Sequence, residues 1–196
     1  MKFAGAGLLA LPVCFAAYGV VRLIGRVDGR YGPGPDWQAA HVVNLVGLLV
    51  FIPALVALWR SLPRTRGRDA AVVVALVGAA TTVVQFVVDV VAGLLAADKA
   101  GMNEISGRFG DLPGAHLLFY VVGPPLLHLG LLALTILLRL PWWSPVLVLV
   151  GSALTIFSLD LIPVAGACLL VAMIPLARTR DRISPPPRHA QRMAVD

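Results

Sequence analysis

Long apolar runs alternate with short polar segments along the whole chain. Four of these runs are long enough to form single membrane-spanning helices: residues 3–24, 39–59, 70–97 and 114–138. A helix needs about 20 apolar residues to cross the roughly 30 Å hydrocarbon layer of a bilayer. The pattern therefore predicts an all-α, polytopic integral membrane helix bundle.

A fifth apolar run, residues 145–177, is too long for one regular span. Its 33 residues would make a straight helix of about 50 Å. Asp160 is costly in lipid, and Pro163 lacks a backbone donor. We therefore predict a break between Ser158 and Pro163, which gives two short spans, near 143–158 and 162–177. These two spans would form a short hairpin and bring the total to six.

The distribution of basic residues favours six spans over five. With six spans, eleven Lys and Arg residues lie inside and five outside, whereas five spans give six inside and ten outside. Cytoplasmic segments carry an excess of Lys and Arg, so six spans with both termini in the cytoplasm are predicted. Anionic lipid headgroups should gather at the cytoplasmic face, near Arg60 to Arg68.

The segments between and beyond the spans are short. We expect an irregular outer loop at 25–36, which is rich in glycine and proline, and a second outer loop at 98–112. Residues 1–180 should form one transmembrane domain, and the proline-containing tail at 181–196 should be disordered. The N-terminal run is long enough to span a membrane, so we interpret it as a retained helix rather than a cleaved signal.

Composition supports the membrane interpretation and excludes other classes. The chain is 59% hydrophobic and only 13% charged, whereas soluble domains carry about 25% charged residues. The net charge of +6 does not indicate nucleic-acid binding, because the basic residues lie at the ends of apolar runs and in the tail. Cys14 and Cys168 lie inside apolar runs and fit small hydrophobic side chains. The Ala-, Val-, Leu-, Gly- and Arg-rich composition resembles that of small multi-pass proteins from high-GC bacteria, which implies a bacterial inner membrane.

Ionisable and polar residues inside apolar runs are the candidate functional residues, because such residues are costly in lipid. Helix rise and the predicted topology place eight of them in the outer half of the bilayer. They are Arg22, His41, Asn44, Gln85, Asp89, His116, Tyr120 and Asp160. A further stripe of residues spaced by four, His116, Tyr120, Pro124 and His128, runs down the fourth span, which Gly123-Pro124-Pro125 interrupts.

Two function hypotheses from different classes fit this distribution. In the first, the protein is a small transport or binding module, or a structural subunit, with an outward-facing polar cavity. Its candidate binding residues are Arg22, His41, Asn44, Gln85, His116 and Tyr120. In the second, it is a membrane-embedded enzyme that acts on an isoprenoid or lipid by acid/base chemistry of carboxylates. Its candidate catalytic residues are Asp89, Asp160 and His128.

The same polar residues also have purely structural interpretations. Side chains near helix ends reach water by snorkelling, and Asp160 fits a hairpin turn. We expect Asp89 to point into the bundle and to meet Arg22, His41, His116 or the neighbourhood of Asp160. Arg22 is the first choice, because it has the opposite charge and a similar depth.

No cofactor or metal is predicted, and the sequence leaves open whether the protein is an enzyme. Bis-histidine haem would need two facing histidines at equal depth. His41 and His116 match in depth but lie near the interface, and His128 has no partner at equal depth. Zinc would need three or four ligands at convergent positions, which no spacing indicates. The chain has no glycine-rich phosphate loop, Cys-x-x-Cys motif or serine nucleophile elbow. An apolar small molecule and the lipid bilayer are the expected partners.

Overall fold

A computed structural model describes residues 5–27 and 32–183, and this part of the chain is helical throughout with short connections. The elements in order are α1 (Ala6–Val27), α2 (Pro35–Ser61), α3 (Arg66–Leu95), α4 (Lys99–Gly110), η1 (His116–Val122), α5 (Gly123–Leu137), α6 (Trp143–Phe157), η2 (Leu159–Leu161) and α7 (Ile162–Ile183).

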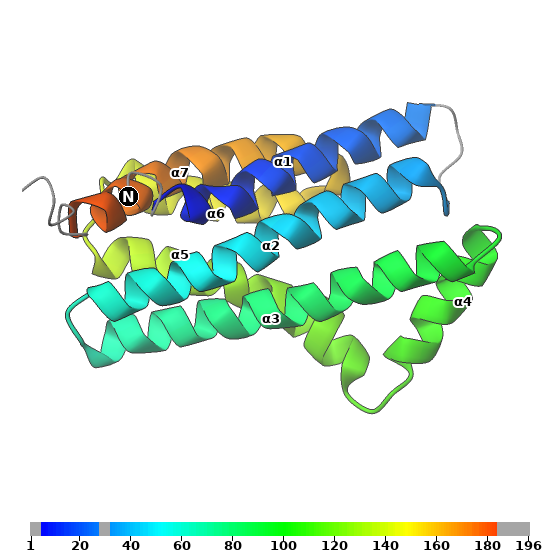
Figure 1. The fold of residues 1–196 in the computed structure, drawn as a ribbon, viewed down its shortest axis with the longest axis horizontal. Helices are drawn as coiled ribbons and strands as arrows, with labels where there is room; N and C mark the ends of the chain where they lie inside the picture. Colours follow the sequence, from blue (N-terminus) through cyan, green and yellow to red (C-terminus); the bar gives the residue numbers. More distant parts are fainter. Residues whose placement is uncertain (1–4, 28–31, 184–196) are drawn as a thin grey trace, which may run out of the picture.

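The long helices lie side by side in an elongated bundle (Figure 1). Helix α1 packs between α2 and α7, α3 packs on α2 and α5, and α6 packs on α7. The start of α1 and the end of α7 lie at the same end of the bundle as the α2–α3 connection. We call this end the Arg-rich end, after Arg60, Arg64, Arg66, Arg68, Arg139 and Arg178. We call the opposite end, where α1 ends and α7 begins, the Asp160 end.

Five helical segments are long and apolar enough to cross a membrane: Ala6–Val27, Pro35–Ser61, Arg66–Leu95, His116–Leu137 and Leu159–Thr179. They match the predicted all-α class and are compatible with a multi-pass membrane protein. Helix α6 is a sixth apolar helix but has only 15 residues. At 1.5 Å per residue it is about 22 Å long, shorter than the hydrocarbon layer.

The long fifth apolar run is divided at the predicted position. Helix α6 ends at Phe157, one 3₁₀ turn follows, and α7 begins at Ile162. The Ser158 hydroxyl accepts a hydrogen bond from the Asp160 amide at 3.2 Å, and Pro163 lies in the first turn of α7, where its missing donor costs nothing. Helices α6 and α7 then lie antiparallel, since the Ser144 hydroxyl donates to the Ala172 carbonyl at 2.5 Å.

The predicted span at 114–138 is not one regular helix. It consists of the π-helix η1 followed by α5, and the Gly123 amide donates to the carbonyl of Leu118, five residues earlier. Pro124 and Pro125 follow at once and cannot donate backbone hydrogen bonds, so the regular α-helical pattern cannot continue through them. No residue of η1 is buried, whereas α5 packs closely on α3.

Small residues allow α3 and α5 to approach backbone to backbone. A methyl group added at Gly78 would overlap the backbone of Leu127, and one added at Gly130 would overlap the backbone of Ala75. Close helix contacts through small residues are typical of membrane bundles, where packing rather than the hydrophobic effect drives association. One face of α5 is thereby fixed against α3.

The connections differ from the predictions in three places. The second outer loop contains α4, whose N-terminus is capped by the Asp98 side chain accepting from the Gly101 amide at 2.8 Å. The first loop is shorter than expected because α1 continues to Val27, and residues 28–31 lie outside the described residues. Residues 181–183 of the tail, expected to be disordered, continue α7, and the rest of the tail also lies outside the description.

Candidate functional site

Asp160 forms ion pairs with two arginines of α1. Its carboxylate accepts from Arg22 at 3.0 Å and also from Arg26. Only 9% of the Arg22 side chain is exposed, so the pair neutralises a largely buried cation. The expected pairing of Arg22 with Asp89 is therefore wrong. The reason is the antiparallel packing of α1 and α7, with Gly19 against Pro163, which brings the residues of the η2 turn beside the end of α1.

Trp37 and His41 belong to a group of rings at the same end. The two rings stack at 4.0 Å between centroids, and His41 also contacts Tyr18 and Phe86 at 5.2 and 5.4 Å. His41 Nδ1 bonds to the Trp37 carbonyl at 2.8 Å, so that nitrogen carries the proton. The Trp37 indole donates to the Asp89 backbone carbonyl at 3.2 Å and thereby joins α2 to α3.

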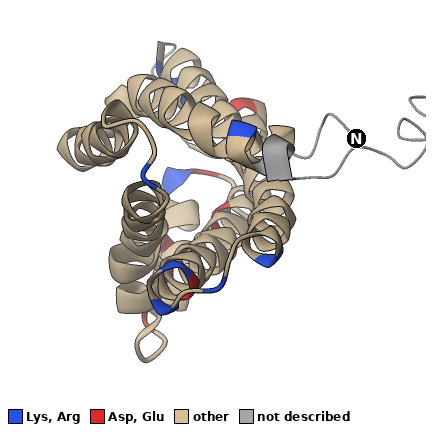
Figure 2. Cartoon of the chain, turned by 90° about the vertical axis from the view of Figure 1, so that its left-hand side faces the viewer, with Lys and Arg blue, Asp and Glu red and all other residues tan. Residues whose placement is uncertain are grey.

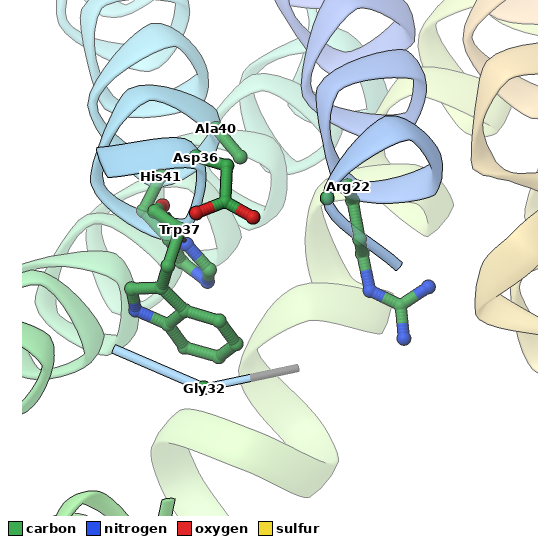
Figure 3. Close-up of a pocket in the computed structure, with 7 residues that line it drawn as sticks. Arg22, Gly32, Asp36, Trp37, Ala40 and His41 are labelled. Carbon is green, nitrogen blue, oxygen red and sulfur yellow. Dashed lines mark hydrogen bonds between the residues drawn. The ribbon is translucent and has the colours of Figure 1, made fainter. Parts of the chain in front are cut away.

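A small cavity lies between this ring group and Arg22. Figure 3 shows Trp37 and His41 on one side of it and Arg22 on the other. Its volume is about 10 Å³, which is close to the minimum that holds one water molecule. It is too small for an organic ligand.

A much larger cavity, of about 540 Å³, lies within the bundle. Residues of α1, α2, α3, α5, α6 and α7 line it, together with residues of η1 and η2. The sequence candidates Asn44, Gln85, Tyr120 and His128 all border this one cavity. Pro124 and Pro125 border it too, so the interrupted part of the fourth span forms part of its wall.

Two buried polar atoms at this cavity have no hydrogen-bond partner among the described residues: Asn44 Oδ1 and the Tyr120 hydroxyl. Asn44 is only 2% exposed. A buried polar group without a partner is costly, and each such group in a native structure calls for a physical explanation.

Three other hydroxyls of wall residues are already bonded. Thr82 donates to the Gly78 carbonyl, Ser152 to the Val148 carbonyl and Thr155 to the Ser152 carbonyl, each at 2.7 Å. These bonds lie within the residues' own helices, as is usual for hydroxyl side chains in membrane helices. Asn44 and Tyr120 are the wall residues with a buried polar atom that has no partner among the described residues, and we call these two residues the polar pole.

His128 borders the cavity, with its ring 6.5 Å from that of Phe15. His116 is exposed on η1 and stacks on Tyr120 at 5.8 Å. In the described part of the chain, no group of three or more His, Cys, Asp or Glu residues is arranged to hold a metal ion.

Asp89 and Asp160 do not form a two-carboxylate site. Asp160 is held by the arginines of α1. Asp89 is half-buried on α3, close enough to the Tyr120 hydroxyl to interact with it electrostatically. Its carboxylate makes no hydrogen bond or ion pair with any described residue. Neither carboxylate borders the large cavity.

Several cavity residues were not among the sequence candidates. Leu11, Phe15 and Tyr18 of α1 border the cavity and are spaced by three and four residues, so they share one helix face. That spacing is readable in the sequence. However, an apolar face of a membrane helix meets lipid or protein equally well, so the spacing alone does not predict a cavity.

Comparisons with protein-family models, with curated proteins and with solved structures found no match to this chain. Function is therefore argued from the site itself.

Proposed function

We propose that this protein is a multi-pass membrane protein with six spans and both ends in the cytoplasm, and that it binds a lipid-soluble small molecule in the large cavity. The single observation that carries the proposal is the cavity of about 540 Å³, two of whose wall residues each carry a buried polar atom without a partner among the described residues. Ligand sites are typically 300–1,000 Å³, mostly apolar, with a few polar groups that orient the ligand.

The charge distribution supports the orientation. Arg60, Arg64, Arg66, Arg68, Arg139 and Arg178 lie near helix ends at the Arg-rich end, and Figure 2 looks onto that end. The positive-inside rule assigns such an end to the cytoplasm, where it attracts anionic lipid headgroups. The start of α1 and the end of α7 lie at this end too, which suits an even number of spans and requires the short α6 to cross as well.

Exposed wall residues support a ligand that comes from the lipid phase. Leu129, Leu149, Ile156 and Leu159 border the cavity and are 52% to 83% exposed. They belong to α5, α6 and η2. In a bilayer, this apolar surface would contact hydrocarbon, and we infer that the cavity opens sideways between α5 and α6. A lipid-soluble molecule reaches it without crossing the polar ends of the helices.

This binding role is better supported than a carboxylate enzyme. Acid/base catalysis requires a carboxyl group within hydrogen-bond reach of the substrate. Asp89 and Asp160 are not on the cavity wall, and Asp160 is held in ion pairs. The cavity offers amide, phenol and imidazole groups instead, which suit binding and orientation.

Native mass spectrometry of the full chain in detergent tests the proposal with three probes of one carbon skeleton: farnesol, its methyl ether and the saturated hydrocarbon farnesane. We expect at least one probe to bind with a stoichiometry of one. The variant Ala153→Trp, which places an indole in the cavity wall, should abolish binding. The control Val146→Trp, on the same helix but not on the cavity wall, should retain it. Failure of all three probes to bind, or equal binding in both variants, would overturn the proposal.

A further inference from the structure

The two residues of the polar pole come from elements that are far apart in the sequence. Asn44 comes from α2 and Tyr120 from η1, and both border the same cavity. Asn44 Oδ1 and the Tyr120 hydroxyl are buried without a partner among the described residues. Because each lost hydrogen bond is costly in a low-dielectric interior, a ligand group that bonds to both atoms would gain affinity.

The chemistry of these atoms specifies the ligand group. An amide oxygen only accepts, so the ligand has to donate a hydrogen bond to Asn44. A phenol hydroxyl donates as well as accepts, so the same ligand group can accept from Tyr120. A hydroxyl group does both at one atom. An ether or ketone oxygen can only accept and would leave Asn44 Oδ1 unpaired.

The lack of charged residues on the described cavity wall restricts the ligand further. Among the described residues that border the cavity, none is Lys, Arg, Asp or Glu. A charged headgroup placed there would lose its hydration without gaining a counter-charge, at a large cost. The arginines of α1 at the Asp160 end are engaged by Asp160. The ligand is therefore neutral.

We propose that the cavity binds a neutral, lipid-soluble alcohol, with its hydroxyl between Asn44 and Tyr120 and its hydrocarbon chain along the leucines of α5 and α6. This inference rests on the proposed function and names its ligand class. The chain of the alcohol enters between α5 and α6, where the wall is apolar and exposed to lipid.

The test compares the affinity of the full chain in detergent for alcohols and for their methyl ethers. Farnesol and farnesyl methyl ether form the isoprenoid pair, and hexadecanol and hexadecyl methyl ether form the straight-chain pair. A site built to bond a hydroxyl rejects the analogue that lacks the donor, because its own polar atom is left unpaired. We expect at least one alcohol to bind about tenfold or more tightly than its ether, and the better pair identifies the chain type.

Three variants assign the preference to the polar pole. Tyr120→Phe removes only the hydroxyl, and Asn44→Leu removes the amide at similar volume. Each should bring the alcohol and the ether to similar affinities. The control Ser152→Ala removes a wall hydroxyl that is already bonded to the Val148 carbonyl and should keep the preference. If Asn44→Leu fails to give a monodisperse protein, Tyr120→Phe decides the test alone.

The outcomes separate this inference from the proposed function. Equal affinity for alcohol and ether in the wild-type chain would overturn the inference but leave a lipid-soluble ligand in place. An alcohol preference that survives both Asn44→Leu and Tyr120→Phe would also overturn it. If no probe binds at all, the proposed function fails with it.

Discussion

Two polar regions of the bundle use similar residues in opposite ways. In the Asp160-end cluster (Arg22, Arg26, Trp37, His41 and Asp160), every side chain has a partner: arginines meet a carboxylate, and rings stack on rings. At the cavity pole, Asn44 Oδ1 and the Tyr120 hydroxyl have none among the described residues. In a low-dielectric interior, satisfied polar groups hold helices together and unsatisfied ones cost stability. The cluster therefore serves the fold, and the pole is available to a ligand.

The largest effect should come from breaking the cluster. Asp160→Asn removes the negative partner of Arg22, whose side chain is only 9% exposed. Loss of this ion pair beside a largely buried cation costs more than loss of a neutral hydrogen bond. We expect the largest fall in Tm among the variants considered, measured by thermal unfolding in detergent. Arg22→Gln on the same chain should recover part of the loss.

Arg26→Gln is the matched control for that variant. The Arg26 side chain is 44% exposed, and exposed ion pairs contribute little to stability. Asp160 also keeps Arg22 in this variant. A Tm for Arg26→Gln as low as that for Asp160→Asn would show that burial of Arg22 does not govern the cluster.

The second effect has the opposite sign and concerns the pole. Asn44→Leu replaces a buried, unpartnered amide with an apolar side chain of similar volume. Because an unsatisfied buried polar group costs about 1–3 kcal/mol, the ligand-free protein should gain roughly that amount in its free energy of unfolding. Denaturation in detergent, after removal of lipid-soluble molecules, measures it. A loss of stability would mean that the amide is already satisfied and that the two regions do not differ.

The long apolar helices and the main break were predictable from the sequence because they depend on local physics. The lengths of the apolar runs predict the helices. Asp160 and Pro163 predict the break after α6, because a carboxylate is costly in lipid and proline has no backbone N–H to donate. Of the eight residues that depth along each helix placed in the outer half, Asn44, Gln85 and Tyr120 border one cavity.

Partner choice was not predictable, because it depends on which helices are neighbours. Arg22 and Asp89 have opposite charges and similar depths, so the sequence predicted that they form an ion pair. Because α1 packs on α7, Arg22 forms its ion pair with Asp160 instead. The π-helical turn of η1 was missed for a related reason. Gly123-Pro124-Pro125 indicates an interruption, but whether the chain kinks or widens there depends on how α5 packs on α3.

A smaller effect is expected at His41, within the cluster. The ring is 3% exposed and lies among Tyr18, Trp37 and Phe86. His41→Phe keeps the aromatic packing and loses the bond to the Trp37 carbonyl. We expect a loss of less than about 1.5 kcal/mol, as for volume-conserving changes, and no change in probe binding. Loss of binding in a well-folded His41→Phe variant would show that His41 belongs to the ligand site and not only to the cluster.

The smallest effect is expected at Asp89, which belongs to neither region. Its backbone carbonyl accepts from Trp37, and substitution of the side chain leaves that bond in place. Its carboxylate is half-buried and makes no hydrogen bond or ion pair with a described residue. Asp89→Asn therefore breaks no pair and removes a group that is costly to keep in an apolar setting. The Tm in detergent should stay the same or rise slightly.

This result would sharpen the comparison, because Asp89 and Asp160 are both carboxylates at the same end of the bundle. If ion pairing is what separates them, Asp160→Asn lowers the Tm and Asp89→Asn does not, and Arg22→Gln rescues only the first. A fall in Tm for Asp89→Asn that Arg22→Gln partly restores would instead show that Arg22 pairs with Asp89 in the membrane.

The probe affinities of Asp89→Asn add a second measurement. Asp89 does not border the cavity, so the alcohol preference should persist, whereas its loss in a stable variant would extend the polar pole from Tyr120 to Asp89.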